Sequence, residues 1–180
     1  MEESLPVFKY HPDPITTRSI VKKNGICPLC KRQREYFYIG RYKLYKGPQN
    51  EYFQICPWCL SEGKAEEVAH CNFSSECSFD GNVSSKSAEE VAFRTPGFST
   101  WQEKIWLTHC NEPCAFIGYV DRKYLEDHSI DVHEDIEREA KKRDYIPEIV
   151  LSMLEDNNCY QGYLFCCVMC GKYRLFVDSD

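Results

Sequence analysis

The sequence lacks any long apolar segment and any recognisable export signal. No run of about eighteen apolar residues occurs along the chain, so no membrane-spanning helix is predicted. The opening stretch, MEESLPVFKYHPDP, has no basic region followed by the apolar region that is typical of a secretory signal. We therefore expect a cytoplasmic protein with no membrane partner.

The common catalytic motifs are also missing. The chain contains no G-x-S-x-G, no H-E-x-x-H and no glycine-rich phosphate loop. His128 and His133 lie among carboxylates, which is a weak indication of a metal site, but solvated helix faces explain this pattern better. The sequence therefore indicates a protein that is not an enzyme.

Basic residues are fewer than acidic ones. Lys and Arg number 22 against 28 Asp and Glu, which gives a formal net charge of −6. Proteins that grip nucleic-acid phosphates normally present a basic surface. Direct nucleic-acid binding is therefore the less favoured expectation.

Cysteine, in contrast, is abundant. The chain has 12 cysteines, and in a reducing compartment paired cysteines are more often metal ligands than disulfides. The motifs CPLC and CPWC have the C-x2-C spacing of structural zinc sites, because each tight turn can direct two sulfurs at one ion. We predict that one Zn²⁺ is shared by Cys27, Cys30, Cys56 and Cys59. The alternatives are reduced thiols in a core and a redox C-x-x-C motif.

A second four-sulfur set is predicted from the remaining cysteines. CVMC supplies Cys167 and Cys170 and is followed by Gly171, while HCNEPC supplies Cys110 and Cys114 at a slightly wider spacing. CVMCGKYRLFV also resembles CPLCKRQREYF, which suggests that both segments do the same job. A second structural Zn²⁺ is therefore expected on Cys110, Cys114, Cys167 and Cys170.

Other residues compete for, or are left over from, this second set. His109 is the main competitor for a ligand position, although a histidine at the C-terminus of a helix is the simpler explanation. Spare thiols are expected at the four other cysteines, which are Cys71, Cys77, Cys159 and Cys166. Because both predicted sets fill four positions with protein ligands, both ions are expected to be structural.

The order of predicted elements indicates the α+β class, with zinc-ribbon-like knuckles and short antiparallel hairpins on which several helices pack. Strands are predicted over 35–45 and 115–120, and a hairpin in GYLFCCV and YRLFVD. Helices are predicted over 61–71 from Ser61, over 87–94 from Ser87, over 99–110 from Thr100, and within 122–154 with a break before Pro147.

Six motifs taken together resemble the CbrC-type colicin-tolerance family of bacterial proteins. They are PVFKYHPDP, CPLC, CPWC, RTPGFSTWQ, HCNEPCAFIG and GYLFCCVMCGKYRL, and their order runs nearly end to end. The resemblance implies one compact domain over 1–180, with a first zinc-ribbon-like half at 20–62 and a second half with inserted helices at 94–180. It implies tolerance to a nuclease toxin but no chemical mechanism. Cys166 and the cysteines of the 70–78 loop depart from the family pattern.

One segment is strongly acidic. Residues 124–137 carry six carboxylates and no Lys or Arg. An ordinary solvated helix would explain this, but an acidic face could also meet a basic partner such as a nuclease toxin, with electrostatic steering. The predicted partner-binding residues are Glu126, Asp127, Asp131, Glu134, Asp135 and Glu137.

The main alternative is that the protein is a zinc-ribbon module with a nucleic-acid-binding or regulatory function. Residues 31–46, KRQREYFYIGRYKLYK, interleave basic and aromatic side chains, as stacking platforms for bases do. A strand with its aromatic residues inward and its basic residues outward would give the same pattern.

Overall fold

The computed structural model describes residues 4–40, 43–44, 54–65, 71–72, 78–102, 104–155 and 160–179. The chain divides into two compact units. Unit 1 comprises Met1–Cys77 and Ser84–Ser99, and unit 2 comprises Ser78–Val83 and Thr100–Asp180. The predicted half at 20–62 falls within unit 1, and most of the predicted half at 94–180 falls within unit 2.

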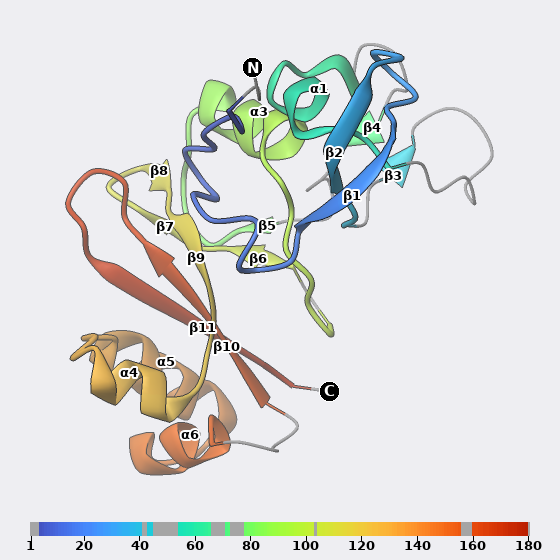
Figure 1. Ribbon diagram of the computed structural model, residues 1–180. Coiled ribbons are helices and arrows are strands. Elements are labelled where there is room, and N and C mark those ends of the chain that lie inside the picture. Colours follow the sequence, from blue (N-terminus) through green and yellow to red (C-terminus); the bar gives the residue numbers. More distant parts are fainter. Residues whose placement is uncertain are drawn as a thin grey trace. The chain divides into compact units, whose positions relative to one another are not determined.

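Unit 1 is built around an antiparallel hairpin (Figure 1). Strand β1 (Ile20–Ile26) pairs with β2 (Gln33–Tyr38), with an irregularity between Lys22 and Gly25. Two helices, α1 (Pro57–Ser61) and α3 (Ser85–Arg94), contact each other. The short strands β3 (Lys43–Leu44) and β4 (Cys71–Asn72) pair antiparallel. One core cluster comprises Phe8, Ile20, Tyr38, Ile55, Leu60 and Ala65.

The proline-rich arm before β1 forms turns, and its histidine is completely buried. His11 Nδ1 lies 2.7 Å from the Pro96 carbonyl oxygen and Nε2 lies 2.7 Å from Thr17 Oγ1. A carbonyl can only accept, so Nδ1 carries a proton. Burial lowers the pKa of His11 from 6.5 to about 4.

Unit 2 is built on a three-stranded antiparallel sheet in the order β11–β10–β9 (Figure 1). The strands are β9 (Ala115–Val120), β10 (Tyr160–Cys166) and β11 (Tyr173–Ser179). Helices α4 (Arg122–Asp127), α5 (His133–Arg143) and α6 (Pro147–Met153) lie beside it. Aliphatic side chains from the strands and helices form one core, including Val120, Ile136, Val150, Leu164 and Leu175.

Short strands complete unit 2. Strand β5 (Ser78–Phe79) pairs parallel with β6 (Ile105–Trp106), and β7 (Thr108–His109) pairs antiparallel with β8 (Glu112–Pro113). The helix predicted over 99–110 is therefore wrong. Trp106 has no exposed surface, and its indole N–H donates to the Cys114 carbonyl at 2.8 Å, so tertiary burial overrides the local helical pattern.

Two helix predictions need smaller corrections. Helix α3 begins after Ser84, whose side chain accepts from the backbone N–H of Ser87, so Ser84 is the cap and Ser87 lies inside the helix. The helix predicted over 61–71 does not start at Ser61, which ends α1, and residues 66–70 lie outside the described residues. The break before Pro147 is confirmed, because α6 begins there.

The mixture of helices and small antiparallel sheets confirms the α+β class. None of the described helices has the length or the apolar character needed to cross a lipid bilayer.

Candidate metal centres

The first candidate centre brings together the four cysteines of CPLC and CPWC, in unit 1. The Sγ atoms of Cys27, Cys30, Cys56 and Cys59 all lie within 4.8 Å of one another. Two measured separations, Cys27–Cys59 and Cys30–Cys56, are both 3.8 Å. Thiolates held ~2.3 Å from one tetrahedral ion are separated by about 3.8 Å, whereas a disulfide bond is ~2.05 Å long. The four cysteines are free thiols whose arrangement fits a tetrahedral metal ion.

The CPLC half of this centre is a tight knuckle between β1 and β2. The Lys31 N–H donates to the Cys27 carbonyl at 2.9 Å, and the Cys27 N–H donates to the Arg32 carbonyl at 3.0 Å. Lys31 has φ 59°, which closes the turn. The side chain of Arg34 lies over the Trp58 ring, 4.2 Å from its centroid, so the knuckle is attached to the CPWC half by a cation–π contact.

The CPWC half opens a short helix. Cys56 is the N-cap of α1, Pro57 occupies the first helical position and Cys59 lies in the first turn. Opening a helix is also a feature of redox C-x-x-C motifs, which are the alternative for this pair. The sulfurs nevertheless face those of Cys27 and Cys30, as ligands of one ion would.

The sulfurs of the first centre are part of the core. Cys27, Cys56 and Cys59 are at most 1% exposed and form a buried cluster with Phe37. The Cys56 thiol donates to Cys27 and lowers the Cys27 pKa to about 4, while the same contact raises the pKa of Cys56. Burial raises the pKa of Cys59 to about 12. Without an ion, the contacts favour the Cys27 thiolate, and a cation is needed to hold Cys56 and Cys59 ionised.

The second candidate centre, in unit 2, differs from the predicted set in one ligand. His109, Cys110, Cys167 and Cys170 offer donor atoms that lie within 4.8 Å of one another. The Cys110 and Cys170 sulfurs are 3.8 Å apart, and His109 Nδ1 lies 3.2 Å from the first and 3.3 Å from the second. Tetrahedral Zn–S and Zn–N bonds would separate S and N by about 3.6 Å, within a few tenths of these distances. Histidine, not Cys114, completes this group.

The CVMC knuckle repeats the geometry of the CPLC knuckle. The Gly171 N–H donates to the Cys167 carbonyl at 2.9 Å, and the Cys167 N–H donates to the Lys172 carbonyl at 2.8 Å. Gly171 has φ 75° at the position that Lys31 occupies in the first knuckle. Burial raises the pKa of Cys167, but backbone donors from Cys170 and Met169 outweigh it and lower the pKa to about 6. The knuckle thus favours the thiolate that a metal ion requires.

The other half of the second centre is the two-residue turn between β7 and β8. Cys110 and Asn111 have φ 54° and 57°, the positive values of a type I′ hairpin turn. Asparagine tolerates this conformation, but cysteine adopts it rarely. A non-glycine residue in a sparsely populated region of φ/ψ space is typical of functional sites, and here it accompanies a metal-ligating geometry.

Cys114 lies outside the group because of the same turn. Its N–H donates to the Leu107 carbonyl at 2.9 Å, and the residue has no exposed surface. Burial raises the pKa of the Cys114 thiol to about 12, which disfavours the thiolate. The C-x3-C spacing of HCNEPC was therefore misleading. The signal that the sequence did offer was Asn111 after two adjacent donors, since asparagine favours a tight hairpin turn.

A partly buried ion-pair network holds the β7–β8 turn against the sheet. The Arg174 side chain donates through Nη1 to the Thr108 carbonyl, through Nη2 to Asp80, and through Nε to both oxygens of Asp135. Asp80 Oδ1 accepts from the N–H and hydroxyl of Thr108. Both backbone groups of the residue before His109 are thus fixed by this network, which orients the ligand turn.

The structure assigns Asp135 a structural role rather than a partner-binding one. Its side chain is 3% exposed, and besides Arg174 it accepts from the Leu175 N–H at 2.7 Å. The prediction that Asp135 binds a partner is therefore wrong, because the side chain is buried inside unit 2. Asp135 lies on the face of α5 that turns toward β11.

The other five predicted partner-binding carboxylates are exposed. Three of them pair with Lys or Arg of the same unit: Glu126 with Arg122, Asp127 with Lys123, and Glu134 with Lys172. Glu137 lies 3.1 Å from His133 Nε2. Asp131 accepts from the His133 N–H.

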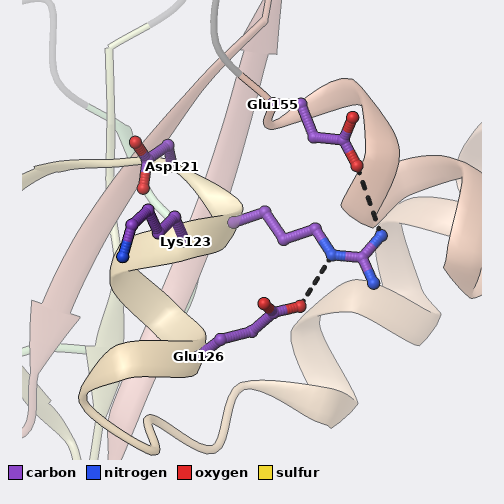
Figure 2. A pocket seen from close by; sticks show the side chains of 5 residues that line it. Asp121, Lys123, Glu126 and Glu155 are labelled. Atoms are coloured by element: carbon purple, nitrogen blue, oxygen red, sulfur yellow. Dashed lines mark hydrogen bonds and ion pairs between the residues drawn. The ribbon is translucent and has the colours of Figure 1, made fainter.

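One shallow hollow lies beside this acidic segment. Its volume is about 240 Å³, and its lining residues are all charged: Asp121, Arg122, Lys123, Glu126 and Glu155. Figure 2 shows the Glu126 and Glu155 carboxylates converging on one guanidinium, that of Arg122. Exposed pairs of this kind contribute little to stability.

The aromatic segment of unit 1 does not present a stacking platform where it is described. Phe37 and Tyr38 are buried, and Tyr36 packs against the core. Residues 41–42 and 45–46 of the segment lie outside the described residues.

Comparison with known proteins places the chain in a family. Residues 5–179 match the model of the uncharacterised protein family UPF0167. A UPF0167 protein of Mycobacterium bovis is 35% identical over 182 residues, covering 98% of this chain and 94% of its own, and one of Mycobacterium tuberculosis has the same values. A UPF0167 protein of Pseudomonas aeruginosa is 35% identical over 127 residues, covering 69% of each chain. No solved structure matches the chain. The chain belongs to the UPF0167 family.

Proposed function

We propose that this protein is a non-enzymatic binding protein that is folded around two zinc ions. The observation that carries the proposal is the pair of four-donor groups, each with an S–S separation of 3.8 Å. Thiolate and imidazole donors in a tetrahedral arrangement suit Zn²⁺. With four protein ligands at each centre, a tetrahedral ion has no open position for a substrate or an activated water, which supports a structural role.

Metal analysis of the purified protein tests this proposal. We expect two zinc ions per chain by mass spectrometry of the metal content. The variants Cys56→Ser and Cys170→Ser should each lose one ion, since each removes one donor from one centre. Binding of fewer than two ions by the unaltered protein, after reconstitution under reducing conditions, would contradict the proposal.

We further propose that unit 2 binds a basic protein partner. Unit 2 contains seventeen Asp and Glu against nine Lys and Arg, whereas unit 1 contains eleven against thirteen. The chain's net negative charge therefore resides in unit 2, which also carries the exposed carboxylates of α4 and α5. A nuclease toxin needs a basic surface for DNA, and the resemblance to the CbrC-type colicin-tolerance family makes such a toxin the partner of first choice.

A binding measurement with a purified nuclease-type colicin domain tests this second part. We expect a complex at micromolar concentration whose association slows as salt is added. Replacing Glu126, Asp127, Asp131, Glu134 and Glu137 by Gln or Asn should slow association. The matched control is Glu62→Gln and Glu35→Gln in unit 1, which should leave the rate unchanged. No complex, or equal rates for both sets, would contradict the proposal.

Nucleic-acid binding remains the alternative function. The excess of basic residues in unit 1 supports it, while the burial of Phe37 and Tyr38 counts against a stacking platform. A nucleic-acid binding assay across a salt series tests this alternative, because phosphate contacts make the affinity for nucleic acid fall steeply as salt is added.

A further inference from the structure

The two centres differ in how far solvent reaches their ligands. In the first centre, only Cys30 has appreciable exposure, and the other three sulfurs belong to residues that are at most 1% exposed. In the second centre, Cys110 and Cys170 are exposed and His109 is partly exposed, so Cys167 alone is buried. A competing ligand can therefore reach an ion in the second centre directly, but must open the protein to reach one in the first.

The centres also differ in how many of their metal ligands belong to the hydrophobic core. Cys27, Cys56 and Cys59 themselves make up a core cluster with Phe37. The aliphatic core cluster of unit 2 contains no cysteine, and of the four donors of the second centre only Cys167 is buried. Removal of the first ion would leave mutually repelling thiolates or protonated thiols inside a core, whereas removal of the second would leave the aliphatic cluster of unit 2 intact.

The ligand positions of the second centre are held by contacts that do not involve a metal ion. The CVMC knuckle closes a hairpin with seven residue pairs from Tyr160–Ser179 to Cys166–Tyr173. On the other side, Arg174 and Asp80 bind both backbone groups of Thr108, next to His109. The donor group can therefore keep its shape when the ion leaves, and it can bind an ion again without refolding.

From these three differences we propose that the second centre is an exchangeable zinc site. It passes its ion to external thiolate or chelating ligands while the chain stays folded, and the first centre retains its ion. In the exchange, the incoming ligand bonds to the ion as the three Zn–S bonds and the Zn–N bond break. The three sulfurs are then left as thiolates or, after proton uptake from the solvent, as thiols. This inference rests on the proposed function, because it requires that both centres hold zinc.

The test is chelator-induced zinc release from the reconstituted full-length protein, followed with a colorimetric zinc chelator under reducing conditions. We expect two phases of one equivalent each, the first more than about tenfold faster, a ratio that corresponds to ~1.4 kcal/mol. After the fast phase, the amides of β10–β11 should still be protected from hydrogen exchange. After the slow phase, protection should be lost across β1–β2.

Single variants assign the phases. Cys110→Ser should remove the fast phase and leave one slowly released ion. Cys30→Ser should remove the slow phase, and if this variant does not fold, Cys110→Ser still decides the assignment. The matched control Cys166→Ser changes a neighbouring cysteine outside the donor group and should preserve both phases. If Cys110→Ser removes the slow phase, or if both ions leave at one rate, the inference is wrong. A protein that never holds two ions would instead refute the proposed function.

Discussion

Loss of the Arg174 side chain should cost unit 2 a large part of its stability. Its side chain is 12% exposed, and its guanidinium binds Asp135, Asp80 and the Thr108 carbonyl. Arg174→Met keeps most of the apolar stem but removes every donor. Asp135, with a side chain 3% exposed, would then lose its bidentate partner inside the protein.

The magnitude follows from what remains after the substitution. Breaking a buried ion pair by removing one partner costs about 3–5 kcal/mol. Two features of the site place the loss at the lower end of this range. Arg138 still pairs with Asp135 from a position 48% exposed, and the Asp80 side chain is itself 25% exposed. We therefore expect a loss of about 3 kcal/mol, a large part of the 5–15 kcal/mol that typically stabilises a domain.

Urea unfolding in buffer with excess zinc measures the effect, with hydrogen exchange of β10–β11 peptides reporting on unit 2 alone. With a slope of ~2 kcal/mol per molar urea, the midpoint should fall by about 1.5 M. The double variant Asp135→Asn/Arg174→Met should recover a large part of the loss, because the uncompensated charge is gone. A loss below about 1 kcal/mol, or additive effects in the double variant, would refute the reasoning.

Three further predictions concern single side chains. The buried, neutral His11 has its pKa lowered to about 4, so the unfolded chain takes up a proton below pH 6.5 while the folded chain does not. Stability should therefore fall by about 2 kcal/mol between neutral pH and about pH 5, and the His11→Gln variant should show a smaller fall in the same urea titrations. Cys167→Ser should abolish one zinc equivalent and lower the thermal midpoint far more than Cys166→Ser, and equal effects would contradict the assignment of ligands. Cys114→Ala should keep both zinc equivalents in metal analysis at a cost of about 1 kcal/mol of core packing, and loss of an ion would return Cys114 to the ligand set.

The sequence predicted those parts of the centres that depend on local spacing. In CPLC and CVMC, two cysteines three residues apart close a turn through backbone bonds that any suitable sequence can make, so the knuckles could be predicted. The pairing of each knuckle with its second half depends on tertiary structure. Spacing alone favoured Cys114, but the positive φ of Cys110 and Asn111 turns the chain within two residues and presents His109 and Cys110 instead. The failed helix over 99–110 has the same origin, because burial of Trp106 and the pairing of β6 with β5 and of β7 with β8 outweigh the local pattern.

The arginine that follows each knuckle shows how one local motif serves two different centres. Arg34 and Arg174 both stand four residues after the second cysteine of their knuckle. Arg34 lies over Trp58 and joins its knuckle to the CPWC helix, so its contact is with an aromatic ring inside a cysteine-rich core. Arg174 binds two carboxylates and the Thr108 carbonyl next to His109. It therefore fixes the ligand turn through contacts that do not involve the metal ligands. The first arrangement makes the metal ligands part of the core that the ion stabilises. The second leaves three of its four ligands, His109, Cys110 and Cys170, outside the buried core, and this exposure is what would allow an ion to leave while the unit remains folded.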